Sequence, residues 1–293
     1  MKTKCDICSS SSFSEIWTKE GYQLVRCHDC DLVFVVNPPS NQQLQQLYSF
    51  ASGYHEALVQ CNYEIERHTA EAKANLRTLS QATSPGALLD VGCSTGLFLL
   101  EAQQSGWRVR GLEYSPDSAK IAKEVHHLEV TQGALAMGAF PANSFDVVTM
   151  WDVIEHLPSP NAALDVVMDI LKPGGLFIAK TPNVDGLYPA MSLLIAGKVG
   201  FWGHPEPPGH LYQFSVNTLG KLLAQKGFII ERVYHQMIPI AYSFGTFRQW
   251  CRSFKWLAYS CVFVPMAILG RLMRRGDAFT MVARKRAASS NTV

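Results

Sequence analysis

The chain has 293 residues, of which 47% are hydrophobic and 17% are charged. This composition supplies apolar material for a full core and argues against an intrinsically disordered protein. The formal net charge of +2 argues against the overall polycation expected of a nucleic-acid-binding protein.

Charge is unevenly divided along the chain. Residues 1–231 carry 16 Lys and Arg and 23 Asp and Glu, whereas residues 232–293 carry 10 Lys and Arg and a single acid, Asp277. Such a split predicts that the two parts meet different partners. The N-terminus has no apolar signal segment, and no apolar run reaches the length of about 18 residues that predicts a spanning helix.

Two cysteine pairs lie near the N-terminus. Their members are Cys5, Cys8, Cys27 and Cys30. Each pair has a C-x-x-C spacing, and two such turns can place four thiolates around Zn²⁺, so residues 1–40 are predicted to form a zinc ribbon. Short strands are expected at 13–17 and 22–26. Because the segment is too small for a core of its own, the metal would be structural. Disulfides or unconnected thiols are the alternative.

Residues 41–83 follow a proline-rich stop at Pro38 and Pro39. They carry interspersed charges and few breakers, so we expect a helical linker or lid. Its aromatic and histidine side chains are Tyr48, Tyr54, His55 and Tyr63. These side chains cover a pocket in one interpretation and pack between helices in the other.

Residues 84–237 alternate between strand-like and helix-like segments. This alternation predicts an α/β fold with a mostly parallel sheet. The strands expected in this region are 87–91, 107–112, 128–131, 145–151, 175–181 and 228–235. A last strand is expected near the C-terminus, at 278–285.

A glycine loop follows the first of these strands. An apolar strand leads into Gly92 and Gly96, and then into a helix at 97–104. Glycine lets the backbone approach a ligand closely, and the helix N-terminus supplies free N–H groups. Glu113 ends the second strand, where a carboxylate can accept from a ribose diol. Asp90 precedes the loop and would repel a pyrophosphate, so the cationic ligand S-adenosylmethionine suits the loop better than NAD does.

Four sequence blocks resemble the motifs of class I S-adenosylmethionine-dependent methyltransferases. The blocks are 88–98, 109–116, 144–157 and 171–182. Residues 210–215 are typical of a subgroup that includes ubiquinone-type O-methyltransferases. The cysteine module resembles those of bacterial sugar C-methyltransferases and of methyltransferases from polysaccharide gene clusters. The resemblance implies a seven-stranded Rossmann-like sheet.

The resemblance also implies a set of cofactor-binding residues. Asp90, Gly92, Cys93 and Gly96 would hold the methionine end. Glu113 would bind the ribose and Tyr114 would flank the adenine. Met150, Trp151 and Asp152 would lie near the methyl donor, and Ser94 and Leu135 complete the set. One departure is Ala134, because the family often has an acid there for the adenine amino group.

Histidines are the candidates for catalysis, because methylation of a hydroxyl or a sugar carbon needs a base with a pKa near working pH. His156 lies five residues beyond the fourth strand. It would act as base or, with Glu155 and Asp152, hold a divalent cation, as the ubiquinone-type relatives imply. The alternative is a helix-capping role for Glu155 and His156. His210 would contact substrate, act as base or hold its own loop in place.

Residues 238–277 form a basic insertion that is expected to be helical. Residues 246–261 have a helical period with Trp and Phe on one side. The apolar run that follows is interrupted at Pro265. We expect peripheral membrane contact through 246–275, assisted by the apolar stretch 187–202, or alternatively a lid or dimer interface. Residues 278–293 would supply the last strand and a tail.

The sequence therefore predicts an S-adenosylmethionine-dependent methyltransferase with structural zinc. The acceptor would be a hydroxyl or carbon of a small or lipid-linked molecule, either a sugar or polysaccharide precursor or a quinone-like compound. The expected location is cytoplasmic, at the inner face of the membrane in the lipid-linked case. The alternatives are a non-catalytic S-adenosylmethionine-binding module and a nucleic-acid methyltransferase. No nucleic-acid partner is expected, because residues 151–154 lack the pattern associated with base N-methylation.

Overall fold

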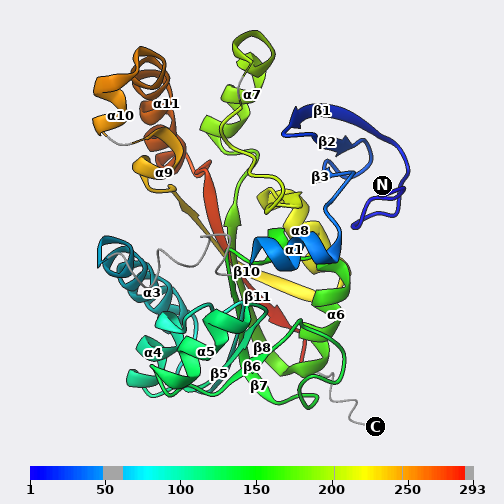
Figure 1. Ribbon diagram of the computed structural model, residues 1–293. Helices are drawn as coiled ribbons and strands as arrows, with labels where there is room; N and C mark the ends of the chain where they lie inside the picture. Colours follow the sequence, from blue (N-terminus) through cyan, green and yellow to red (C-terminus); the bar gives the residue numbers. More distant parts are fainter. Residues whose placement is uncertain (49–61, 201, 246, 288–293) are drawn as a thin grey trace.

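The computed structural model describes residues 1–48, 62–200, 202–245 and 247–287. Two sheets organise them (Figure 1). The larger sheet has seven strands in the order β10-β11-β8-β7-β4-β5-β6. These strands are β4 (Ala87–Val91), β5 (Arg108–Glu113), β6 (Val130–Gln132), β7 (Phe145–Trp151), β8 (Leu171–Pro182), β10 (Phe228–Gln236) and β11 (Ala278–Lys285). The predicted seven-stranded α/β sheet is confirmed.

The pairing of these strands explains where a ligand can enter. β4, β5, β6, β7 and β8 pair in parallel, whereas β11 runs antiparallel to both β8 and β10. The carboxyl ends of the parallel strands therefore meet at one edge. In open α/β sheets that edge, where the strand order reverses, is where ligands bind.

Alternation along the strands builds two cores. Leu88 joins the hydrophobic cluster on one face, and its neighbour Leu89 joins the cluster on the other; Val147 and Val148 divide in the same way. This period of two is expected of a strand buried on both faces. The first face is covered by α3 (Asn62–Ala82), α4 (Leu97–Gln104) and α5 (Pro116–Glu124), and the second by α6 (Pro160–Ile170) and α8 (Val216–Gln225).

The smaller sheet contains the N-terminal ribbon and one strand of the core. Its order is β1-β2-β3-β9, formed by β1 (Phe13–Lys19), β2 (Tyr22–Cys27), β3 (Val33–Val35) and β9 (Tyr212–Gln213). The two predicted ribbon strands are present. The third strand and its pairing with β9 were not predicted, and they attach the ribbon to the core.

The structure describes part of the predicted helical linker. The described residues form α1 (Asn41–Leu47), where Ser40 caps the first turn, and later α3. Tyr54 and His55 lie outside the described residues, so their predicted place in a lid is not tested.

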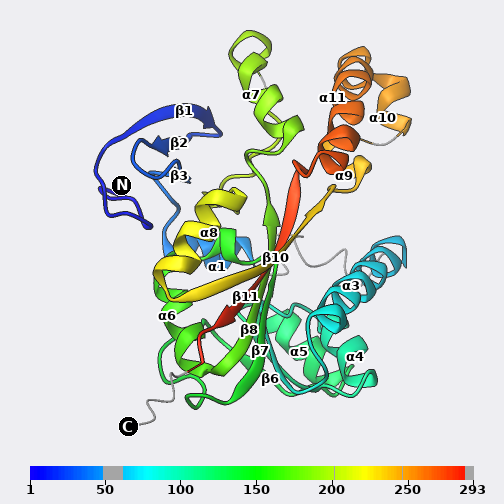
Figure 2. The same ribbon diagram turned by 180° about the vertical axis from the view of Figure 1, so that it is seen from behind.

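Four helices project from the cavity end of the sheet (Figures 1 and 2). They are α7 (Leu187–Val199), α9 (Ile240–Phe244), α10 (Phe247–Arg252) and α11 (Phe254–Leu272). The predicted interruption at Pro265 is wrong, because α11 continues through this proline. Instead the chain divides at Ser253, whose side chain caps α11.

α11 also corrects the expectation that no segment reaches spanning length. It has 19 residues and a mean hydropathy of 1.2, which would suffice to cross a membrane by length and composition. No other helix among the described residues meets both criteria. Length and composition do not decide between a membrane span, a surface helix and a core helix.

Candidate active site

The loop between β4 and α4 borders a cavity of about 1060 Å³. Gly92 has a φ of +72°, and a Cβ at this position would lie 2.5 Å from Cγ2 of Val153. Glycine is therefore required both by the backbone angle and by the contact. Cys93 and Ser94 also line the cavity. Gly96 caps α4 with a φ of +88° but is not part of the cavity wall.

Glu113 joins the glycine loop to the end of β5. Its carboxylate accepts one hydrogen bond from the backbone N–H of Ser94 and another from that of Ser115, each at 2.7 Å. Burial raises the pKa of Glu113, and these N–H donors oppose the shift. Because Glu113 also lines the cavity, its carboxylate is in place to accept hydrogen bonds from a bound diol.

Asp90 is a buried acid at the cavity end of β4. Asp90 is almost completely buried, and its Oδ1 accepts a hydrogen bond from Thr149 Oγ1 at 2.7 Å. Burial raises the pKa of Asp90 to about 8. An acid in this state favours a cationic partner, because the partner's charge would compensate the buried carboxylate.

Aromatic and small apolar residues complete the cofactor half of the cavity. Tyr114, Ala134 and Leu135 line it, as does Trp151, whose ring packs edge-on against Phe98 at 5.2 Å. Ala134 offers no side-chain acceptor at the position where the family often has an acid. Of the residues expected near the methyl donor, Asp152 lines the cavity, whereas Met150 is fully buried in the sheet.

Asp152 belongs to a three-residue ion network. It has a φ of +55°, a region that non-glycine residues rarely adopt. Its Oδ2 lies 2.7 Å from Nζ of Lys180, which also contacts Glu71 on α3. The two acids outweigh the burial of Lys180 and raise the pKa of its ammonium. The network fixes α3 to the carboxyl ends of β7 and β8.

His156 lies on the cavity wall in the short helix η2 (Ile154–His156). Its Nδ1 lies 3.0 Å from the carbonyl oxygen of Gly209 and 3.0 Å from the hydroxyl oxygen of Tyr48. Burial lowers the pKa of His156 to about 4, so the ring is neutral at neutral pH.

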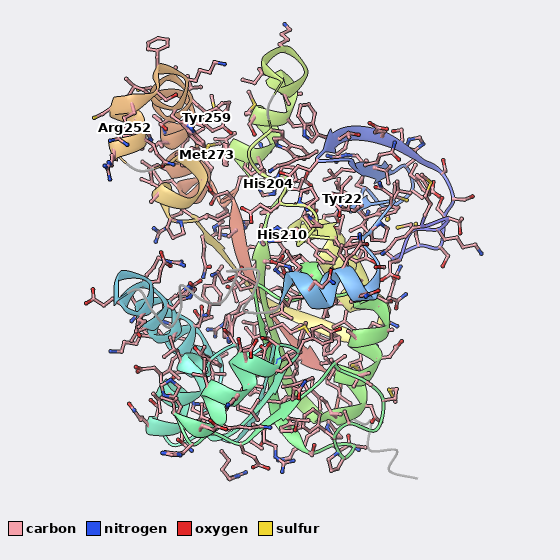
Figure 3. All side chains as sticks on the ribbon, in the orientation of Figure 1. Tyr22, His204, His210, Arg252, Tyr259 and Met273 are labelled. Carbon is pink, nitrogen blue, oxygen red and sulfur yellow. The ribbon has the colours of Figure 1, made fainter. Side chains whose placement is uncertain are left out.

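Glu155 and His210 lie next to His156 but do not line the cavity. The rings of His156 and His210 are 4.7 Å apart between centroids. Both carboxylate oxygens of Glu155 are buried without a hydrogen-bond partner among the described residues. One ligand atom each from Glu155, His156 and His210 lies within 4.8 Å of the others, a spacing that could hold a metal ion. Figure 3 shows His204 and His210 between the ribbon and the core sheet.

Several cavity residues were not predicted as site residues. Tyr48 was expected only as a lid or packing residue. On the helical wall, Arg67 and His68 lie with Glu71, and Arg67 Nη2 is 2.7 Å from Glu64 Oε2. Lys180 carried a usable signal, since a lysine in an otherwise apolar buried strand needs a charged partner.

The four ribbon sulfurs lie within 4.8 Å of one another, and none forms a disulfide. The Sγ atoms of Cys5 and Cys30 are 3.4 Å apart, and those of Cys8 and Cys27 are 3.5 Å apart. These separations are close to those of four thiolates around one zinc ion, at Zn–S distances of about 2.3 Å. The cluster is therefore consistent with a structural zinc site, and the disulfide alternative is absent.

The residues around the glycine loop also fit S-adenosylmethionine. The hydroxyl oxygen of Ser94 is buried without a partner, so a ligand in the cavity can supply one. The acids Asp90 and Glu113 offer acceptors for an ammonium and a diol, and the aromatic wall suits an adenine. A buried acid, a glycine loop and a cavity at the carboxyl ends of parallel strands define a Rossmann-like protein that binds a nucleoside cofactor.

Comparison with known proteins identifies the family. Residues 63–233, more than half of the chain, match the methyltransferase domain family. The chain therefore belongs to this family.

Distant relatives and solved structures agree with this assignment. A ubiquinone biosynthesis O-methyltransferase of Xanthomonas axonopodis is 34% identical over 103 residues, which are 33% of this chain and 43% of the relative. One from Xanthomonas campestris is 35% identical over 107 residues, 34% of this chain and 44% of the relative. The match thus spans less than half the length of these relatives.

Two solved methyltransferases share the fold. One from Archaeoglobus fulgidus has a TM-score of 0.52 and 19% identity, over 74% of this chain and 94% of that one. One from Thermotoga maritima has a TM-score of 0.53 and 16% identity, over 84% and 99% of the two chains. At such identities the likeness supports the fold and not the acceptor.

Proposed function

We propose that the chain methylates an oxygen or a carbon of a small acceptor, with His156 as the base. The observation that carries this proposal is the contact between His156 Nδ1 and the Gly209 carbonyl oxygen at 3.0 Å. A carbonyl can only accept, so Nδ1 carries the proton and Nε2 keeps its lone pair. A neutral histidine on the cavity wall has a free nitrogen for the acceptor's proton. Because its pKa is lowered to about 4, His156 is a weaker base than the sequence predicts and accepts the proton only as the new bond forms.

The cofactor supplies a methyl group on a positively charged sulfur. Asp90 and Glu113 would orient it by binding its ammonium and its ribose hydroxyls. His156 takes the proton as the acceptor atom forms its bond to the methyl carbon and the bond to sulfur breaks. Tyr48, which contacts the same ring nitrogen, orients the imidazole. Alignment of these groups is the main requirement of such a displacement.

The remaining cavity wall favours an acceptor with an apolar part. Beyond the cofactor residues it is lined by Leu44, Leu157, Pro158 and Val166. The relatives with a named reaction are O-methyltransferases of ubiquinone biosynthesis, which supports a hydroxyl on a quinone-like or lipid-linked compound. The resemblance of the ribbon to those of sugar C-methyltransferases supports a carbon of a sugar or polysaccharide precursor as the second candidate.

A divalent cation is the alternative to a histidine base. Glu155, His156 and His210 offer three ligand atoms, and a cation held there would lower the pKa of an acceptor hydroxyl. Activity that survives exhaustive treatment with EDTA supports the base. Activity that is lost and then restored by Mg²⁺ supports the cation, whereas restoration by Zn²⁺ alone would be explained by refilling of the cysteine cluster.

Transfer of label from methyl-labelled S-adenosylmethionine tests the proposal. The protein is incubated with bacterial extract separated into lipid, small-molecule aqueous and macromolecular fractions. We expect label in the lipid fraction, with the aqueous fraction as the outcome for a soluble sugar acceptor. His156→Gln should lower kcat by about 10²–10⁴-fold and leave cofactor affinity unchanged, whereas the surface control His127→Gln should change neither.

Two results oppose the proposal in different ways. Label confined to nucleic acid in the macromolecular fraction would support the nucleic-acid alternative. Cofactor binding without labelled product in any fraction would support the non-catalytic module.

A further inference from the structure

We infer that α11, together with the exposed side of α7, docks on an anionic lipid membrane, with α11 lying in the plane of the surface. This inference goes beyond the proposed methyl transfer and does not depend on which acceptor is used. It rests on two helices that project from the core (Figures 1 and 2) and on the apolar and charged residues that they expose.

One face of α11 is fixed to the protein. Its buried residues are Ser260, Phe263, Ala267 and Gly270, a spacing that forms a single stripe along a helix. Phe263 packs against Tyr188 of α7 with ring centroids 5.5 Å apart, and Ser260 Oγ donates to the Phe244 carbonyl oxygen at 2.8 Å. α11 is therefore held as an ordered element and not as a loose arm.

The opposite face of α11 is apolar and exposed. At about 100° per residue, the positions directly opposite the buried stripe are uncharged and most are large and apolar, and Lys255 lies at the edge of this face. The exposed uncharged residues on this face of α11, and the residue that follows the helix, are Phe254, Leu257, Ala258, Cys261, Val262, Pro265, Ile268, Leu269, Leu272 and Met273. Phe254 is 83% exposed and Leu272 is 75% exposed. α7 contributes Leu194, which is 73% exposed.

The charged residues of α7, α10, α11 and the turn that follows α11 are all cationic. The exposed ones are Lys198, Arg248, Arg252, Lys255, Arg271, Arg274 and Arg275. The sequence has no acid between Glu231 and Asp277, and Asp277 is buried at 1% exposure. Anionic head groups would complement this charge. A second copy of the chain would not, because a two-fold interface would bring cationic groups against cationic groups.

The topology favours a helix on the membrane surface over a helix across it. α11 is inserted between β10 and β11, which are neighbouring strands of one sheet, with Gln236 opposite Ala278. The chain must therefore leave and return on the same side. α9 and α10 have 5 and 6 residues, too short to cross a hydrocarbon layer of about 30 Å a second time.

The same edge of the sheet carries the cavity. β8 is parallel to β7 and antiparallel to β11, and β11 is antiparallel to β10. The carboxyl ends of β8 and β10, from which α7 and α9 to α11 arise, therefore point the same way as the strand ends that build the active site. Docking would turn this edge toward the membrane.

Flotation with lipid vesicles tests the inference on the full chain. The probes are vesicles of phosphatidylcholine alone and vesicles with about one third phosphatidylglycerol. We expect binding to the second kind only, weakened by added salt because the cationic contribution is screened. Phe254→Trp, on the exposed face of α11, should add fluorescence that brominated acyl chains quench, whereas Trp256 lies on the same side as the buried Ser260 and should contribute little quenching.

Two double variants separate the apolar from the charged contribution. Leu269→Asp with Leu272→Asp, and Arg252→Glu with Lys255→Glu, should each raise the lipid concentration for half-maximal binding at least tenfold. The matched controls are Val125→Asp, at a side chain with 62% exposure, and Lys120→Glu with Lys123→Glu, all near α5. Unchanged affinity for S-adenosylmethionine confirms that every variant is folded.

Three outcomes would overturn the inference. The first is absence of binding to phosphatidylglycerol vesicles at low salt. The second is binding that the α11 variants leave unchanged. The third is a dimer, measured by analytical ultracentrifugation, that Leu269→Asp with Leu272→Asp dissociates while no vesicle binding is seen.

Discussion

Phe34 of the ribbon and Tyr212 of the core lie opposite each other as a register pair of β3 and β9. Backbone hydrogen bonds lead from this pair of strands toward the cavity. Val35 N–H donates to the Leu211 carbonyl oxygen at 2.9 Å, and Leu211 N–H donates to the Glu155 carbonyl oxygen at 2.9 Å. The ribbon is therefore connected by main-chain hydrogen bonds to the segment that carries His156.

The ribbon also reaches the N-terminus of α6. Asp6 accepts from the backbone N–H of Asn161 at 3.1 Å and from the hydroxyl of Ser159 at 3.2 Å. Ser159 lines the cavity. A carboxylate at this helix end satisfies free N–H groups and interacts favourably with the helix dipole. Both contacts attach the ribbon to segments that line the cavity.

Loss of the metal should therefore affect the active site. We expect Cys8→Ser to lower the zinc content measured by mass spectrometry and to increase amide hydrogen exchange in β3 and β9, because structural zinc stabilises small domains strongly. Cys251→Ser, at an exposed cysteine, is the control. Full zinc content in Cys8→Ser, or unchanged exchange in β9 after zinc loss, would contradict this prediction.

The glycine loop offers a matched pair of substitutions. Gly92 and Gly138 have similar φ values of +72° and +78°, but only a Cβ at Gly92 meets a neighbour, Val153 at 2.5 Å. Gly138→Ala should lower the free energy of unfolding by about 1 kcal/mol through backbone strain alone. Gly92→Ala should cost about 1–3 kcal/mol more through overpacking, and Val153→Ala should restore part of it. Urea denaturation measures all three, and equal losses at the two glycines would reject the steric argument.

Asp90 should make cofactor binding depend on pH. Its pKa of about 8 in the free protein means that the carboxyl is mostly protonated at pH 6. A cationic ligand favours the ionised form, so binding below pH 8 should release a proton, and affinity should rise as pH increases toward 8. Calorimetry in buffers of different ionisation enthalpy measures the proton release.

Asp90→Asn provides the corresponding test by mutation. We expect it to abolish this proton release and to weaken S-adenosylmethionine binding by about 10–100-fold, as loss of a buried charge partner does. Glu124→Gln, at an exposed acid on α5, should leave both quantities unchanged. If Asp90→Asn still releases a proton when the ligand binds, that proton comes from another group.

The ion network and a surface ion pair can be compared directly. Lys180→Met removes the cation between Asp152 and Glu71, although Glu71 keeps its ion pair with Arg67 at 3.9 Å. We expect a loss of about 2–3 kcal/mol of unfolding free energy, chiefly from Asp152. Lys172→Met breaks the pair with Asp146, whose side chains are 39% and 38% exposed, so it should cost less than about 1 kcal/mol. Thermal denaturation compares the stability lost in the two variants. A larger loss in Lys172→Met would contradict the prediction that the ion network contributes more to stability than the surface pair.

The strands of the core were predictable because burial leaves a strong pattern. The segments 87–91, 145–151 and 278–285 are mostly apolar, and the structure has the same limits for β4, β7 and β11. β8 begins earlier than predicted, at Leu171, because Pro173 and the following glycines hide the start of the strand from a propensity argument.

Other features depend on contacts between distant parts of the chain. β3 has three residues, too few for a periodic signal, and its strand character comes from pairing with β2 and β9. Tyr48 reaches His156 across 108 positions of sequence. Pro265 stops helices in most contexts, yet the packing of Phe263 and Ala267 on either side holds α11 together through it.

The position of α9 to α11 within the sheet has a further consequence. Gln236 and Ala278 are already paired across β10 and β11, and Ile238 N–H donates to Asp277 Oδ1 at 2.8 Å, closing the base of the insertion. Everything between these residues is a single long hairpin connection. This connection can therefore change in length or sequence without altering the register of a strand or a residue that lines the cavity, so the surface that it presents is independent of the cavity.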